Sequence, residues 1–142
     1  MSYSRIMGLD YGSKTIGVAI SDPLKITAQG IETLQINEAI NDFKIKRIKE
    51  FVKEYSVVEI VVGLPKNMDN SLGFRAEATL NFVEILKNKI KNVEVILQDE
   101  RLSTMSAERV LLEADVSRKK RKKVIDKMAA VFILQTYLDK LR

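Results

Sequence analysis

The stretch RIMGLDYGSKTIGVAI, residues 5–20, contains two apolar runs joined by a Gly-Ser-Lys turn. Arg5–Leu9 predicts a short strand that leads to Asp10, and Thr15–Ile20, which is rich in β-branched residues, predicts a second strand. The segment Ile26–Gln35 alternates loosely between apolar and polar residues and predicts a third strand. These segments are expected to form an antiparallel three-stranded meander.

Helical and strand-like patterns alternate in the rest of the chain. In chain order, the expected elements are a helix within Ile40–Tyr55, a strand over Val57–Val62, a helix starting near Ser71, a strand over Val93–Leu97, a short helix near Thr104–Ala114 and a last helix over Lys123–Leu141. The inner faces are expected to carry Phe82, Val83, Leu86 and Ile90 on the second helix, and Val124, Met128, Val131, Leu134 and Leu138 on the last.

The order of these elements predicts an α/β fold in which residues 1–142 form one domain. Three antiparallel strands followed by alternating helices and strands imply a mixed five-stranded sheet with helices on both faces. Because crossover connections are right-handed, the fourth strand should lie parallel beside the first. The carboxyl ends of the first, fourth and fifth strands then share one edge, where open α/β sheets bind ligands.

The composition excludes several kinds of chemistry. The chain has 142 residues with no Cys and no His, so it has no disulfides, no thiolate metal sites and no Ser-His-Asp triad. Any catalysis must therefore use carboxylates, lysines, hydroxyls or a metal held by oxygen. The longest apolar run, Met128–Leu134, is far short of the roughly 18 residues of a membrane helix. Since Arg5, Asp10 and Lys14 occupy the region where a signal peptide is apolar, we expect a cytoplasmic protein without membrane association.

Acidic residues follow two of the strands that share the predicted edge. Asp10 ends the first strand, and Glu100, next to Asp99, follows the fifth. Asp126 lies near the start of the last helix, which could bring it over the same edge. Gathered carboxylates repel one another unless a cation intervenes, and Mg²⁺ and Mn²⁺ prefer oxygen ligands. Two such ions can hold a phosphodiester and activate the attacking water, so this pattern is typical of a metal-dependent phosphodiester hydrolase.

Each of these acids also has a simpler explanation. Asp10 with Gly12 fits a turn, the Asp99–Glu100 pair fits a solvent-exposed strand end, and Asp126 fits the positive end of a helix dipole. The glycine-rich stretch Gly8–Gly17 also resembles the phosphate-binding hairpin of the sugar kinase and actin type of ATPase. Those ATPases need two such domains, and the chain has no Gly-x-x-x-x-Gly-Lys phosphate loop.

The basic excess of the chain comes from one place. There are 24 Lys and Arg residues against 19 Asp and Glu, and six of the cations form one run: Arg118, Lys119, Lys120, Arg121, Lys122 and Lys123. Without this run, 18 basic residues face 19 acidic ones. The run fits either a solvated loop or an arm that binds the phosphates of a nucleic acid, and a location inside a packed element is not expected.

Four stretches together resemble the successive motifs of the YqgF (RuvX) family. They are GLDYGSKTIGVAISD (8–22), VVGLPKNMDNSLGFRAE (61–77), DERLSTMSAERVL (99–111) and SRKKRKKVIDKMAAVFILQTYLD (117–139). The resemblance covers essentially the whole chain. It implies a ribonuclease H-like fold related to the RuvC Holliday junction resolvases, and a nuclease that processes the 5′ end of pre-16S rRNA.

The resemblance further implies that Asp10, Glu100 and Asp126 are the carboxylates of a metal-dependent active site, with Mg²⁺ or Mn²⁺ as the cofactor. The first motif departs from the family, which often has Arg where this chain has Thr15, and this departure removes one possible phosphate contact. Ser103 stands where Thr is usual and keeps the hydroxyl.

Three functions therefore compete. The first is a nuclease acting on structured RNA, in which the run Arg118–Lys123 grips the backbone and Lys14 or Arg101 neutralises developing charge. The second is a Holliday junction resolvase, which needs a two-fold dimer to cut four-way DNA symmetrically. The third is a non-catalytic RNA-binding factor of ribosome assembly. We expect a monomer or a weak homodimer, with pre-16S rRNA as the main nucleic-acid partner and branched DNA as the alternative.

Overall fold

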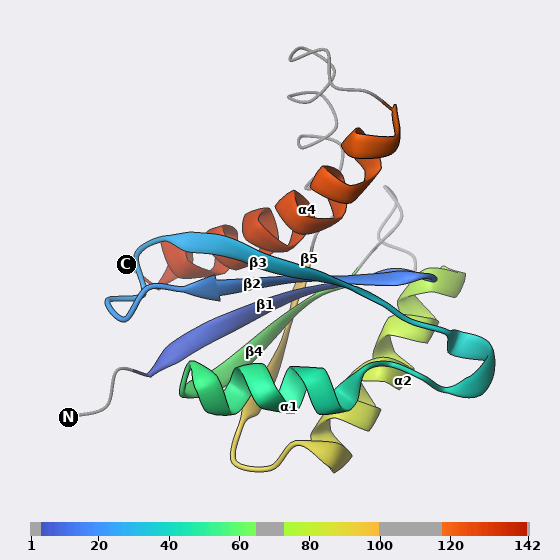
Figure 1. The fold of residues 1–142 in the computed structure, drawn as a ribbon. Helices are drawn as coiled ribbons and strands as arrows, with labels where there is room; N and C mark the ends of the chain where they lie inside the picture. The colour runs from blue at the N-terminus through green and yellow to red at the C-terminus, as the bar shows by residue number, and fades with distance from the viewer. Residues whose placement is uncertain (1–3, 65–72, 100–117, 142) are drawn as a thin grey trace.

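A computed structural model describes residues 4–64, 73–99 and 118–141. Five strands form one sheet in the order β3-β2-β1-β4-β5, with helices on both faces (Figure 1). The strands are β1 (Arg5–Tyr11), β2 (Thr15–Ser21), β3 (Ala28–Gln35), β4 (Val57–Leu64) and β5 (Glu94–Asp99), and the helices are η1 (Glu38–Ile40), α1 (Ile45–Glu54), α2 (Phe74–Lys89) and α4 (Arg118–Lys140). This architecture confirms the predicted mixed sheet.

The first three strands form the predicted antiparallel meander. In β1 and β2, Leu9 lies opposite Val18 and Asp10 lies opposite Gly17. The turn between them is closed by a 2.8 Å hydrogen bond from the Gly12 amide to the Thr15 carbonyl. All three strands form where they are predicted, to within two residues at their ends.

The parallel half of the sheet also follows the prediction. β4 lies parallel to β1, with Leu9 beside Val62, and β5 lies parallel to β4, with Gly63 beside Gln98. β4 is buried from Ile60 to Leu64, as expected for a strand that is covered on both faces. The carboxyl ends of β1, β4 and β5 therefore meet at one edge of the sheet.

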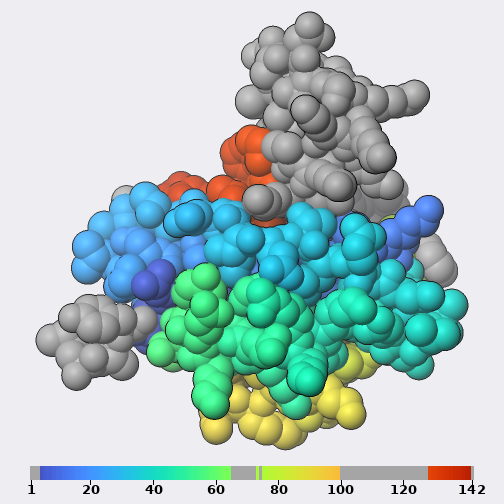
Figure 2. All heavy atoms as spheres, in the orientation of Figure 1, coloured from blue at the N-terminus to red at the C-terminus, as the bar shows by residue number. Residues whose placement is uncertain are grey.

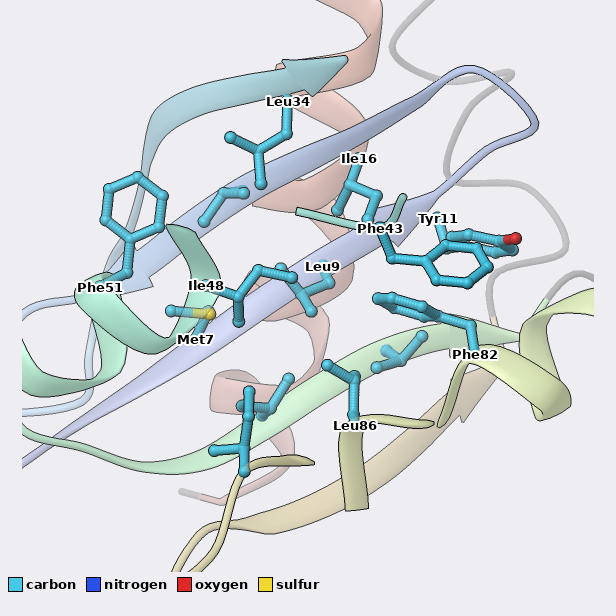
Figure 3. Close-up of a cluster of buried hydrophobic side chains, with 14 of the residues drawn as sticks. Met7, Leu9, Tyr11, Ile16, Leu34, Phe43, Ile48, Phe51, Phe82 and Leu86 are labelled. Carbon is cyan, nitrogen blue, oxygen red and sulfur yellow. The ribbon is translucent and has the colours of Figure 1, made fainter. Parts of the chain in front are cut away.

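The helices α1 and α2 cover one face of the sheet. An ion pair of 3.0 Å between Arg47 Nη2 and Glu32 Oε1 links α1 to β3, and the atoms of these two elements lie side by side in Figure 2. Beneath them lies the larger core cluster, whose members include Met7, Leu9, Ile48, Phe51, Phe82 and Leu86 (Figure 3). The inner face predicted for the second helix is confirmed, because Phe82, Val83, Leu86 and Ile90 are all buried.

The helix predicted within Ile40–Tyr55 begins later, at Ile45. Asn37 and Asp42 exchange two backbone hydrogen bonds of 2.9 Å, and the Asn37 side chain accepts from the Ala39 amide. Asn side chains compete in this way with helical backbone bonds, which is why the helical spacing of the apolar residues does not extend the helix. Ile40 is left 71% exposed in this turn.

The helix α4 covers the other face and begins five residues before the predicted start, at Arg118. The backbone of the run Arg118–Lys123 is therefore helical, and its interpretation as a loop is wrong; Lys and Arg are good helix formers. The predicted inner face is only partly right. Leu134 and Leu138 are fully buried, Met128 and Val131 are only half-buried, and the side chain of Val124 lies outside the described residues. The other fully buried side chains of this face are Ala129, Ala130 and Ile133.

A glycine explains this shift toward small side chains. A Cβ atom at Gly8 would lie 2.7 Å from Leu134 Cβ and 3.0 Å from the Ala130 carbonyl oxygen. The helix therefore approaches β1 too closely for any side chain at position 8. Polar contacts fasten the rest of α4: the Gln135 side chain bonds the Ala28 amide at 2.9 Å and the Ile26 carbonyl at 2.8 Å.

Some predicted elements lie outside the described residues, namely the helix near Thr104–Ala114 and the helix start at Ser71. Within the parts of the chain that are described, none of the helices is long and apolar enough to cross a membrane.

Candidate active site

Asp10 lies at the carboxyl edge of the sheet, on the face that α4 covers. Successive residues of a strand point to opposite faces, and Ile6 of β1 belongs to the cluster beneath α4. Gly8 and Asp10 therefore face α4 as well. Since Leu9 lies beside Val62, the next step of the register brings Asp10 beside Gly63, which lies beside Gln98. The glycine leaves room beside the carboxylate.

The direction of α4 determines which of its residues reach this edge. Tyr137 donates a 2.8 Å hydrogen bond to Glu59, which lies beside Ile6 in the register, whereas Ala130 lies over Gly8. α4 and β1 therefore run in opposite directions, so residues nearer the start of α4 lie nearer the carboxyl end of β1. Asp126 precedes Ala130 by four residues, which is about one helical turn and a rise of ~6 Å. Asp126 therefore lies one turn further along α4, in the direction of the carboxyl edge.

The remaining members of the predicted carboxylate set are described only in part. Glu100 directly follows β5 but lies outside the described residues, as does the side chain of Asp126. Among the residues that are described, no three Asp, Glu, His or Cys side chains form a group that could hold a metal. The donor chemistry nevertheless fits a hard cation, because Asp10 offers carboxylate oxygens and the chain has no Cys or His.

The predicted phosphate contacts fall in different places. Lys14 is exposed on the turn between β1 and β2, at the same end of β1 as Asp10. Its carbonyl accepts a 2.9 Å hydrogen bond from the Ile36 amide, which ties the turn to the end of β3. Arg101 lies outside the described residues, and of the run Arg118–Lys123 only the backbone, in the first turns of α4, is described.

A polar contact set lies directly behind Asp10, on the opposite face of β1. The Tyr11 hydroxyl donates a hydrogen bond to Glu38 Oε2, and Arg75 Nη1 lies 3.3 Å from Glu38 Oε1. The Arg75 guanidinium also lies over the Tyr11 ring, with its central carbon 5.2 Å from the ring centroid. Burial, together with the bond to Glu38, raises the pKa of Tyr11 to about 12.

Two phenylalanine rings pack against the ring of Tyr11. Its ring stacks on Phe82 with the centroids 4.5 Å apart and lies 6.1 Å from that of Phe43. Figure 3 shows the three rings together at one end of the core cluster, with the Tyr11 oxygen on the outer side. Sequence patterns do not reveal this set, because its members come from three elements that are distant in sequence. The sequence gives one local indication of this set, which is that Tyr11 directly follows Asp10.

Two of the solved structures that resemble this fold are resolvases. The fowlpox virus resolvase in complex with Holliday junction DNA has a TM-score of 0.59 at 15% identity, over 96% of this chain and 98% of that one. Thermus thermophilus RuvC in complex with a Holliday junction substrate has a TM-score of 0.56 at 15% identity, over 96% and 95% of the two chains. At this level of identity the likeness concerns the fold alone, and it confirms the ribonuclease H-like architecture.

Curated relatives match at much higher identity. A protein of Staphylococcus haemolyticus is 62% identical over 138 residues, 97% of each chain, and one of Listeria innocua is 63% identical over 135 residues, 95% of this chain and 97% of that one. Both carry the name "Putative pre-16S rRNA nuclease". Residues 4–140 also match the RuvX family, which is described as Holliday junction resolvase. The chain therefore belongs to the RuvX family.

Proposed function

We propose that this chain is a metal-dependent nuclease that processes the 5′ end of pre-16S rRNA. The observation that carries the proposal is the place of Asp10 near the end of β1, on the sheet face that α4 covers and at the edge that the carboxyl ends of β4 and β5 share. The name of the relatives supports pre-16S rRNA as the substrate. Residues 1–142 would act as a single cytoplasmic domain.

In this proposal Asp10, Glu100 and Asp126 together hold Mg²⁺ or Mn²⁺. When bound, such an ion lowers the pKa of the attacking water and offsets the charge that develops on the leaving oxygen. The contribution of the chain is to keep the three carboxylates in place on two strand ends and one helix. Lys14, exposed beside this edge, and Arg101 would neutralise charge on the scissile phosphate.

The first turns of α4 supply the proposed grip on RNA. They carry six consecutive cations and precede Asp126 along the same helix. Figure 1 shows that this part of α4 projects beyond the sheet. A backbone bound there would run toward the carboxyl edge, so the same helix would contribute a phosphate-binding arm and one member of the active site.

A Holliday junction resolvase is the second candidate. It is supported by the description of the family and by the two resolvases with the same fold, both of which are in complex with junction DNA. The chemistry would be the same, but symmetric cutting requires two active sites in a two-fold dimer.

The test is cleavage of an end-labelled RNA that spans the 5′ precursor of 16S rRNA, in Mg²⁺ or Mn²⁺ and in EDTA, with a four-way DNA junction in parallel. Asp10→Asn should remove metal-dependent cleavage. Asp139→Asn is the matched control, because this carboxylate lies near the opposite end of α4 and accepts a 3.1 Å bond from Gln135. Cleavage of the junction alone by a stable dimer would favour the resolvase, and binding without cleavage in any metal would favour an assembly factor.

A further inference from the structure

The last two residues of β1 lie at the carboxyl edge of the sheet. The described pairs between β1 and β4 run from Arg5 to Leu9. Asp10 and Tyr11 are paired with β2, opposite Gly17 and Ile16. The proposed catalytic carboxylate therefore lies near the end of the central strand, and a contact that fixes this strand end also fixes its position.

Tyr11 provides such a constraint on the opposite face. Its side chain is only 6% exposed and is enclosed by the rings of Phe43 and Phe82, which come from the segment before α1 and from α2. Aromatic pairs at these separations stabilise the packed arrangement beyond the effect of the area that they bury. The ring thus anchors the residue that directly follows Asp10.

The hydroxyl adds a directional contact to this anchor. It donates to Glu38 of η1, and Glu38 pairs with Arg75 in the first turn of α2. Arg75 Nη2 is buried and has no hydrogen-bond partner among the described residues. The side chains of Arg75 and Glu38 are 33% and 32% exposed, and their ion pair, with Arg75 also lying over the Tyr11 ring, keeps the acceptor of the Tyr11 hydroxyl in place.

We propose that Tyr11 is a positioning residue for Asp10: its hydroxyl, through Glu38 and Arg75, ties the end of β1 to η1 and α2 and thereby holds the Asp10 carboxylate at the carboxyl edge of the sheet. This inference rests on the proposed function of Asp10 as a catalytic carboxylate. Tyr11 itself lies on the opposite face and does not reach the substrate.

The chain contains a matched control for this role. Tyr137 is a second tyrosine whose hydroxyl donates to a glutamate, Glu59 Oε2, at 2.8 Å. It fastens α4 at the level of Ile6, at the other end of β1. Tyr11→Phe and Tyr137→Phe therefore each remove one oxygen and one tyrosine–glutamate hydrogen bond, and they differ in their distance from Asp10.

The first experiment compares single-turnover cleavage, RNA affinity and melting temperature in the two variants. Removal of a group that hydrogen-bonds a metal ligand directly lowers activity or metal affinity by about 10- to 100-fold, and an effect transmitted through the strand backbone should lie near the lower end, at about 10-fold. We expect this decrease in Tyr11→Phe, with unchanged RNA affinity, and cleavage at the wild-type rate in Tyr137→Phe. Equal cleavage by the two variants at comparable melting temperatures would overturn the proposal, because Tyr11 would then be no more than a structural residue.

Amide hydrogen exchange gives a second measurement that does not need cleavage. Tyr11→Phe should accelerate exchange of the amides of Asp10 and Gly12, whereas Tyr137→Phe should leave them unchanged. If the wild-type protein does not cleave any substrate, the proposed nuclease function fails, but the exchange rates still test the anchor. Unchanged exchange at Asp10 in Tyr11→Phe would refute the positioning role whatever the activity.

Discussion

The two faces of the sheet are built from side chains of different size. Under α1 and α2 lie large residues such as Phe51, Phe82 and Leu86, whereas α4 rests on Gly8 through Ala130 and Leu134. Among the described residues, the first face buries the greater part of the apolar core. The second allows a helix to approach the central strand closely, in the row that leads to Asp10. We infer that the first face mainly provides stability and that the second mainly provides the geometry of the site.

The largest effect on stability is expected on the face of α1 and α2. Leu86→Ala should lower the free energy of unfolding by about 2–5 kcal/mol, since it leaves a cavity at a fully buried position. Urea denaturation measures this decrease, with Leu24→Ala at a 76% exposed position as the control. The folded fraction should cleave at the normal rate. A selective loss of cleavage there would contradict the division between the two faces.

The next effect concerns the packing of α4 on β1. Gly8→Ala places a Cβ atom within 2.7 Å of Leu134 Cβ, so α4 must shift away from β1. Overpacking of this kind costs about 1–3 kcal/mol. The shift also moves the helix at Asp126 relative to Asp10, so cleavage should fall more than the folded fraction does. If cleavage decreases only as much as the folded fraction does, the packing of α4 on Gly8 does not determine the geometry of the site.

The buried elements on the face of α1 and α2 could be predicted from the sequence, but the close packing of α4 on β1 could not. The β-branched run Val57–Val62 and the spacing of Phe82, Val83, Leu86 and Ile90 indicate buried elements through local periodicity, and both predictions are confirmed. The inner face of α4 could not be chosen in this way, because the residue that decides it, Gly8, lies on another element. The contacts among Tyr11, Glu38 and Arg75 likewise exist only after folding.

The position of Asp10 follows from topology. The order of elements alone predicts this residue at a shared strand edge, and the strand order places it there. The helical state of the basic run is not predicted by the same reasoning. Repulsion among like charges argues against a helix there, but the helix propensity of Lys and Arg outweighs it.

The lysines at the start of α4 can be compared with those of α1, which covers the opposite face of the sheet. Replacing Lys119, Lys120, Lys122 and Lys123 by Gln should weaken RNA binding and flatten its salt dependence by about 0.7–0.9 in logarithmic slope for each phosphate that the variant no longer neutralises. The control replaces the exposed lysines of α1: Lys46, Lys49 and Lys53. Titrations at several salt concentrations measure both slopes. Equal flattening in both variants would argue against a localised arm on α4.

The smallest effect concerns pH. Burial, followed by the bond to Glu59, raises the pKa of Tyr137 from 10.0 to about 12. The stabilisation from this raised pKa is complete below pH 10 and is lost as the pH rises through about 12, because the unfolded chain releases the proton first. Urea denaturation at about pH 9 and about pH 11.5, on either side of the unfolded pKa, should therefore show a smaller decrease of stability in Tyr137→Phe than in the wild-type protein. An equal decrease of stability in the two proteins would mean that the Tyr137 hydroxyl does not donate to Glu59 as it does in the structure.

The most direct test of the proposed active site is the metal-dependent cleavage of the 16S precursor RNA by the wild-type protein and by Asp10→Asn, with RNA affinity measured for both. We expect cleavage in Mg²⁺ or Mn²⁺ that is absent in EDTA and lost in Asp10→Asn, while RNA binding and the melting temperature stay close to those of the wild-type protein. Cleavage by Asp10→Asn at the wild-type rate would contradict the central claim that the carboxyl edge beneath α4 is the active site.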